Sequence, residues 1–325
     1  MSRQLSYAKA ILEATDQAMS LSKDVVVLGQ LVDTQSGIFG TTTGLVTKYG
    51  ADRVMDFPVS ENLMTATAMG AALTGLRPII AHQRLDFMIY SLDAIANWLA
   101  LWRFKSNGES AMPVTIRTIV GKGWGQGPQH SKSLHSWFAH LPGLRVAVPA
   151  TAYDAKGLLL ESIFSQTPAI FVEGRGLYSM LDDVPKEPYR VRFGQAVVRR
   201  PGKDVTVVAI GNLVPVALKA AATLEKEGID VEIVDPRTLT PLDRKTLCDS
   251  AFKTRRLVVA DPAWHSFGAA AEIITTVVEN LGDKLKAKPV RVTLPDSHTP
   301  MSMALEPEFY VDESDVISAV KQTLV

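Results

Sequence analysis

Cysteine is almost absent from the sequence: Cys248 is the only one in 325 residues. A single cysteine excludes an internal disulfide and a cysteine-rich metal site, and it fits a reducing compartment. An excess of either charge is also lacking, because lysine plus arginine and aspartate plus glutamate each number 34. With no block of like charge, the composition indicates neither a nucleic-acid surface nor a polybasic membrane patch. Small molecules and proteins are the expected partners.

Long apolar runs are missing too. No stretch approaches the roughly 18 apolar residues that cross a membrane, and residues 1–14 have the spacing of an amphipathic helix rather than of a signal peptide. We therefore expect a cytoplasmic protein. Hydrolase signatures are absent as well, since the sequence has neither a nucleophile elbow nor a paired-histidine zinc helix.

What the sequence does contain is a regular alternation of short buried strands with helical segments. Strands are expected at residues 24–29, 77–81, 113–119, 144–148, 169–173, 204–210, 230–234, 257–260 and 290–292. Helices are expected at residues 5–21, 43–49, 85–104, 154–164, 215–227, 241–252, 267–281 and 313–324, with one more beginning at Glu61. Such alternation is typical of α/β proteins with mostly parallel sheets flanked by helices. A lapse in the pattern at 174–203 predicts a linker between two domains, residues 1–173 and 204–325.

One carboxylate in the first domain is a candidate functional residue. Glu61 follows a helix-start signal, Pro58 and then Ser60, and precedes only small and apolar residues up to Gly75. A helix so rich in alanine and glycine can be approached closely on almost every side, so we expect it to be buried. The helix N-terminus favours an ionised Glu61, whereas burial favours the protonated acid. Position alone leaves open both a structural role as a helix-start acid and a catalytic role.

A second candidate is the stretch from Gly121 to His130, here called the glycine-rich loop, which holds four glycines after an expected strand. Open α/β sheets bind ligands at this end of their strands. The loop matches neither the dinucleotide fingerprint nor the phosphate-binding loop. It is either a flexible surface loop or a backbone that approaches a ligand closely, with His130 suited to proton transfer.

The remaining histidines have simpler explanations. His130, His135 and His140 recur every five residues, but on a helix this spacing fans the rings apart, so we expect no metal site. His82 and His265 stand alone, and lone histidines are more often satisfied structural groups than catalysts.

Aromatic residues gather in the helix expected at 85–104. Phe87, near its start, is either ordinary core or a face on which a planar heterocycle stacks. Trp98, Trp102 and Phe104 form a large apolar surface, which indicates core or a subunit interface rather than a cofactor site.

Several motifs together resemble one family. They are P-V-S-E at 58–61, G-A-A-L-T-G-L-R-P-I at 70–79, H-S-K-S at 130–133, F-A-H-L-P-G-L-R-V-A-V-P at 138–149, D-A-K-G-L-L at 154–159 and V-D-P-R-T-L-T-P-L-D at 234–243. Over nearly its whole length the chain is similar to the β subunit of the thiamine-diphosphate-dependent decarboxylating component of 2-oxo acid dehydrogenases. Pyruvate, branched-chain and acetoin enzymes are members of that family, which lies within the transketolase superfamily.

The resemblance implies a role for each candidate residue. Glu61, in a first domain that binds pyrimidine, would hydrogen-bond the aminopyrimidine ring of thiamine diphosphate and promote formation of the cofactor's carbanion. Phe87 would pack against that ring, and Gln83 would lie beside it. His130 would face the substrate side of the thiazolium, where it would stabilise or protonate the oxygen derived from the carbonyl.

The resemblance also implies that another polypeptide completes the site. Thiamine enzymes hold the diphosphate through Mg²⁺ bound by a Gly-Asp-Gly motif, and this chain has no such motif. A companion α subunit is therefore expected to supply the diphosphate and Mg²⁺ contacts, in an α2β2 heterotetramer. The second domain, similar to the transketolase C-terminal domain, would help to hold β to β.

Three positions depart from the family pattern. Gln30 lies where the family usually has an acid after the first strand, Ala81 lies where it usually has a glutamate, and Arg84 replaces a small or apolar residue. Loss of two acids and gain of a base changes the charge of the pocket, which allows an unusual phosphorylated or carboxylated substrate.

The predicted function is that of a β subunit which cleaves the bond beside the carbonyl of a 2-oxo acid or ketose and transfers the acyl or ketol unit. The 2-oxo acid dehydrogenase type, with a lipoyl carrier as acceptor, is favoured. The alternatives are a split transketolase or acyloin-forming enzyme that uses an aldehyde acceptor, and a non-catalytic assembly subunit.

Overall fold

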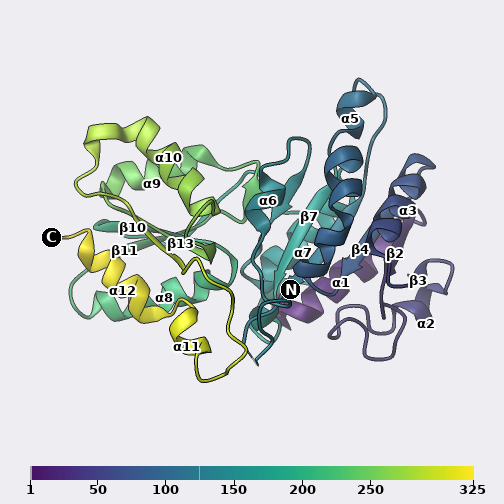
Figure 1. Ribbon diagram of the computed structural model, residues 1–325, viewed down its shortest axis with the longest axis horizontal. Helices are drawn as coiled ribbons and strands as arrows, with labels where there is room; N and C mark the ends of the chain where they lie inside the picture. Colours follow the sequence, from purple (N-terminus) through teal and green to yellow (C-terminus); the bar gives the residue numbers. More distant parts are fainter. Residues whose placement is uncertain (1, 124) are drawn as a thin grey trace. The chain divides into compact units, whose positions relative to one another are not determined.

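The computed structural model describes residues 2–123 and 125–325, which divide into two compact units (Figure 1). Unit 1 contains the chain up to Gly121 together with Trp137–Phe193, and unit 2 contains Lys122–Ser136 together with Gly194–Val325. Each unit is a sheet of mostly parallel strands covered by helices on both faces, which confirms the predicted α/β class. No helix in the described part of the chain is long and apolar enough to cross a membrane.

The sheet of unit 1 has the strand order β6-β7-β5-β4-β2-β3, and neighbouring strands in it are parallel. Its strands are β2 (Val25–Gly29), β3 (Val54–Asp56), β4 (Arg77–His82), β5 (Thr115–Val120), β6 (Arg145–Ala147) and β7 (Ala169–Gly174). All but β3 coincide closely with predicted strands. Parallel strands end at the same edge of a sheet, so the residues after β2, β4, β5 and β7 are brought together there.

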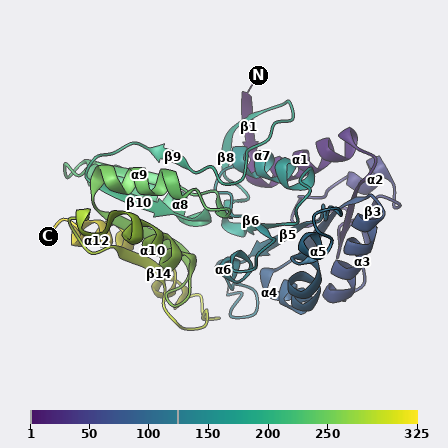
Figure 2. The same cartoon turned by 90° about the horizontal axis from the view of Figure 1, so that it is seen from above.

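Helices cover the two faces of this sheet (Figure 2). On one face α1 (Tyr7–Leu21) and α7 (Ala152–Ile163) pack on each other around a core that includes Tyr7, Ile11 and Phe171. The other face carries α3 (Glu61–Leu73), α4 (Leu85–Met88), η1 (Ile89–Ser91), η2 (Ala94–Leu99) and α5 (Trp102–Lys105). The short helices α2 (Leu45–Tyr49) and α6 (His135–Ala139) lie in connections.

The helix α3 is buried on one face only, which corrects the expectation that it is enclosed. Its inward residues recur at helical spacing and are Glu61, Met64, Thr65, Ala68, Met69 and Ala72. The opposite face, with Ala66 and Gly70, is exposed, and its Leu63 and Leu73 side chains are 53% and 44% exposed. Small residues permit close approach from any side, but within this chain α3 packs against β4 on one side.

The helix predicted over residues 85–104 is also different in detail. The structure divides it into an α-helical turn, a 3₁₀ turn, a π-helical segment and a second α-helical turn. Trp98 is 45% exposed and Phe104 is 89% exposed, so these side chains do not belong to the core of the chain. Their exposure contradicts the core explanation, and a subunit interface at these residues stays a prediction.

The sheet of unit 2 has the strand order β14-β13-β10-β11-β9 and is parallel except for the antiparallel β9. Its strands are β9 (Val197–Arg200), β10 (Val205–Ala209), β11 (Val231–Asp235), β13 (Leu257–Trp264) and β14 (Val290–Leu294). Helices α8 (Val214–Glu225) and α12 (Glu313–Gln322) lie on one side, with α9 (Arg244–Thr254) and α10 (Ala269–Leu281) on the other (Figure 1). The short elements β12 (Thr238–Thr240) and α11 (Glu306–Phe309) follow β11 and β14 in the chain.

The stretch expected to be a linker contains ordered strands. Within it, β8 (Leu181–Pro185) pairs antiparallel with β1 (Ser2–Ser6), and β9 joins the sheet of unit 2. The sequence patterns do not predict β1, since Ser2–Ser6 lacks the continuous apolar run of the central strands.

A buried ion pair connects two central strands of unit 1. Arg117 on β5 donates two hydrogen bonds to Glu173 on β7, from Nε at 2.6 Å and Nη2 at 3.1 Å, and both side chains are at most 2% exposed. Tyr178 donates a third hydrogen bond to Glu173 at 2.5 Å. The carboxylate is therefore fixed by three donors, which compensates for its removal from water.

We expect Glu173→Gln to destabilise the chain by about 3–5 kcal/mol, because it leaves the Arg117 charge buried without a counterion. Glu161→Gln is the matched control: Glu161 lies 4.0 Å from Arg145 and from Arg190 and is 22% exposed, so its loss should cost less than about 1 kcal/mol. The free energy of unfolding from urea titrations measures both. Equal losses in the two variants would contradict the importance of the buried pair.

Candidate functional site

Glu61 occupies the first turn of α3, as the sequence predicts. Its side chain is 9% exposed, and Ser60 precedes it at the N-cap without a side-chain capping bond. The unpaired amides of a first helical turn attract a negative charge, so the position suits a carboxylate that is held in place and shielded from bulk water.

Gln83 and Phe87 lie in the connection after β4 and in α4. Both side chains are partly buried, and Gln83 Nε2 donates to the backbone oxygen of Gln30, at the end of β2, over 3.4 Å. The Gln30 side chain is 9% exposed, and its Nε2 has no hydrogen-bond partner among the described residues. The ends of β2 and β4 thus bring the amide groups of Gln30 and Gln83 to one edge of the sheet.

His130 belongs to unit 2, whereas Glu61, Gln83 and Phe87 belong to unit 1. Its side chain is partly buried, and its backbone amide reaches the carbonyl of Gly127 at 3.5 Å. The structure therefore brings three of the four predicted site residues into one unit and assigns the fourth to the other.

Two arginines face one aromatic ring near the end of β4. The guanidinium carbons of Arg84 and Arg175 lie 5.1 Å and 4.7 Å from the ring centroid of Phe39. The Arg84 side chain is 8% exposed, and this burial lowers the pKa of Arg84. Tyr178 and Asp86 raise the pKa, and the nearby Arg175 lowers it. The sequence patterns single out Arg84 but not Arg175 or Phe39, since contacts across 45 or more residues leave no local signal.

The departure at Ala81 has a structural counterpart. Ala81 on β4 is directly opposite Arg117 on β5, and the Nη1 atom of Arg117 is buried without a hydrogen-bond partner among the described residues. A carboxylate at position 81 would lie on the same face of the sheet as this guanidinium. Its absence leaves Glu173 as the acid that pairs with Arg117 here.

His82 differs from the satisfied histidine that the sequence suggests. It is 1% exposed at the end of β4, and neither ring nitrogen has a hydrogen-bond partner among the described residues. Burial lowers the pKa of His82 to about 3, so the ring is neutral near pH 7.

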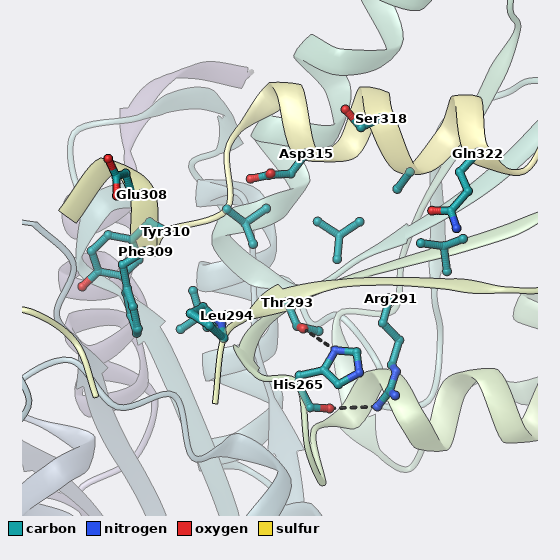
Figure 3. A pocket seen from close by; sticks show the side chains of 15 residues that line it. His265, Arg291, Thr293, Leu294, Glu308, Phe309, Tyr310, Asp315, Ser318 and Gln322 are labelled. Carbon is teal, nitrogen blue, oxygen red and sulfur yellow. Dashed lines mark hydrogen bonds between the residues drawn. The ribbon is translucent and has the colours of Figure 1, made fainter. Parts of the chain in front are cut away.

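A separate cavity of about 510 Å³ lies in unit 2 between β14 and α12 (Figure 3). Asp315, Ser318 and Gln322 project into it from α12, and His265 and Arg291 lie on the other side. None of the four predicted site residues lines this cavity. Over the described residues, no group of three or more histidine, cysteine, aspartate and glutamate side chains is placed to hold a metal ion.

Comparisons with known proteins agree with this architecture. A family model for the transketolase pyrimidine binding domain matches residues 3–180, and one for the transketolase C-terminal domain matches residues 194–316. A solved structure described as a split gene transketolase, inactive beta4 tetramer, has a TM-score of 0.79 at 25% identity, and the match covers 98% of each chain.

Similar sequences extend over the full length. The chain is 40% identical over 334 residues to the acetoin:2,6-dichlorophenolindophenol oxidoreductase subunit beta of Cupriavidus necator, covering 100% of this chain and 98% of that protein. It is 38% identical over 322 residues to the pyruvate dehydrogenase E1 component subunit beta of Staphylococcus epidermidis, covering 99% of each.

The fold and these matches define a subunit of a transketolase-like, thiamine-diphosphate-dependent enzyme. The chain belongs to the family of β subunits that includes those of the pyruvate dehydrogenase E1 component and of acetoin oxidoreductase, which confirms the resemblance seen in its motifs. The names of these relatives as β subunits imply an α partner in the family.

The buried His82 predicts a loss of stability in acid. Above pH 6.5, the ordinary pKa of histidine, the His82 ring is neutral in both the folded and the unfolded chain. Below pH 6.5 only the unfolded chain binds the proton, until the pH reaches the pKa of about 3 that His82 has in the folded chain. Stability should therefore fall by about 2 kcal/mol between pH 6.5 and pH 5 from this residue alone. His82→Asn should flatten that dependence, and the exposed His140→Asn should not; denaturant titrations at several pH values measure it. Identical pH slopes in all three proteins would refute the assignment.

Proposed function

We propose that the chain is the β subunit of an α2β2 enzyme that cleaves the bond beside the carbonyl of a 2-oxo acid and transfers the acyl unit. The observation that carries the proposal is Glu61, a buried carboxylate in the first turn of α3 within the part that matches the pyrimidine binding domain. A carboxylate in that setting is able to exchange a proton with a basic ring nitrogen that is buried against it.

Three residues of unit 1 are proposed to bind the pyrimidine end of thiamine diphosphate. Glu61 would bind the ring nitrogen, Phe87 would pack against the ring, and the amide of Gln83 would lie beside it. Bound there, the cofactor would supply the electron sink that makes cleavage beside a carbonyl possible. The diphosphate and its Mg²⁺ would be held by the α subunit, because this chain has no Gly-Asp-Gly motif.

His130 is proposed to act on the substrate. The imidazole ring carries an N–H group, so this side chain is able to donate a hydrogen bond or a proton to an oxygen that gains negative charge. The two residues thus have different proposed roles: Glu61 acts on the cofactor, and His130 acts on the reacting carbonyl.

The acceptor is proposed to be a lipoyl carrier, as in 2-oxo acid dehydrogenases. The relatives named as pyruvate dehydrogenase subunits favour this choice. Transfer to an aldehyde is the second candidate, supported by the likeness to the split gene transketolase structure. A screen of 2-oxo acids and ketose phosphates with each type of acceptor, using the chain together with its α partner, distinguishes them.

The substrate is proposed to carry a further anionic group. Arg84 and Arg175 concentrate positive charge around Phe39 near the end of β4. Positive charge beside a site attracts phosphate and carboxylate groups, and guanidinium groups bind both through paired hydrogen bonds.

Glu61→Gln should lower kcat by at least about 100-fold in the α2β2 enzyme, because an amide cannot exchange the proton that the carboxyl group exchanges. Assembly with the α subunit, measured by analytical ultracentrifugation, should not change. The exposed Glu279→Gln serves as the control and should retain full activity. Full turnover by Glu61→Gln would exclude the proposed role.

Arg84→Met should raise the KM for a 2-oxo acid with a second anionic group by about tenfold, while the KM for pyruvate changes little. The control is Arg190→Met, which removes a guanidinium stacked on Phe164 at 4.8 Å in another part of unit 1. Steady-state kinetics with both substrates measure the ratio of the two KM values. An equal change in KM for the two substrates would show that Arg84 does not bind the second anionic group.

A further inference from the structure

The glycine-rich loop is attached to the C-terminal part of unit 2. Lys122 lies over the ring of Tyr310 at 5.0 Å, and the Gly125 amide donates to Glu306 Oε1 at 3.2 Å. Gly125 and Gly127 both have positive φ, and a Cβ atom on either would come within 2.9 Å of Met301 atoms. Close contact with the 301–310 segment thus explains the need for glycine in this part of the loop.

His135, which follows His130 in the sequence, makes a second attachment of this segment to unit 2. Its Nε2 lies 2.9 Å from Oδ1 of Asp261, and the two side chains are 1% and 0% exposed. The Asp261 carboxylate is itself fixed by backbone amides, because Oδ1 accepts from Ala263 at 3.2 Å and Oδ2 accepts from Ala270, in the first turn of α10, at 2.9 Å. The imidazole of His135 is therefore held by a carboxylate whose own position is fixed.

The placement of these contacts has a consequence for His130. It lies between Gly125, whose amide donates to Glu306, and His135, whose ring contacts Asp261, so the segment that carries it is attached to unit 2 on both sides. Nine residues, 126–134, separate these two attached positions. His130 is five residues from His135, so release of the imidazole from Asp261 would free the backbone on that side of His130.

We infer that His135 and Asp261 are positioning residues that set the location of His130 for the reaction. The inference rests on the proposed role of His130 and adds to it two residues of unit 2 that hold the segment carrying His130. Asp261 acts through His135, and His135 acts through the loop, so neither residue needs to touch the substrate.

The structural part is tested on the chain by itself through hydrogen exchange of the amides at 125–134. His135→Leu removes the hydrogen bond to Asp261 and should speed exchange in this segment by at least about tenfold. His135→Gln keeps an N–H donor and should restore most of the protection. The exposed His140→Leu is the control and should leave exchange unchanged. Unchanged protection in His135→Leu would overturn the inference.

The functional part is tested with the α2β2 enzyme by a double-mutant cycle. His135→Leu should lower kcat/KM by about 10- to 100-fold in the parent enzyme but by less than about twofold in a His130→Ala background, because misplacing a residue that is already absent costs nothing more. Equal losses in both backgrounds would show a general structural effect and overturn the inference. Full activity of His130→Ala would overturn both the proposed role of His130 and the inference that rests on it. Impaired activity of His130→Ala together with full activity of His135→Leu would overturn the inference alone.

Discussion

The direction of the strands in unit 1 is the constraint on which the rest depends. Because β2, β4, β5 and β7 run the same way, their last residues share one edge, and side chains from distant parts of the sequence meet there. In the interior the Arg117–Glu173 pair connects β5 and β7 within a parallel register of six residue pairs. A slip of one strand by one residue would turn one of these charged groups to the opposite face of the sheet and separate the pair.

Much of this arrangement could be predicted from the sequence. The end of α1 at Leu21, the limits of β2 and the start of α3 at Glu61 follow from local signals: an amphipathic period, a continuous apolar run and a serine at the N-cap. Such signals depend on residues within a few positions of one another. The motifs that carry the family resemblance are equally local: two of them contain Glu61 and His130, and the resemblance adds Gln83 and Phe87 by their positions in the sequence. The roles of those four residues remain predictions.

The features that could not be predicted depend on contacts between distant residues. His135 and Asp261 are 126 positions apart, and nothing near either residue indicates that they meet. We expected α3 to be enclosed because its side chains are small. Small side chains allow another element to pack closely, but they do not show that one is present. The π-helical segment at Ala94–Leu99 keeps the apolar composition of a regular helix, so composition does not reveal it.

The exposed face of α3 has a consequence for how such a chain is made in the cell. From Asn62 to Leu76 the chain carries no charged residue, and Leu63 and Leu73 are exposed, so no charge on this face opposes contact with another chain. A chain synthesised in excess of whatever covers this face would be open to chaperones, proteases and self-aggregation. Balanced production with a binding partner, rather than intrinsic stability alone, would then govern how much of the chain persists.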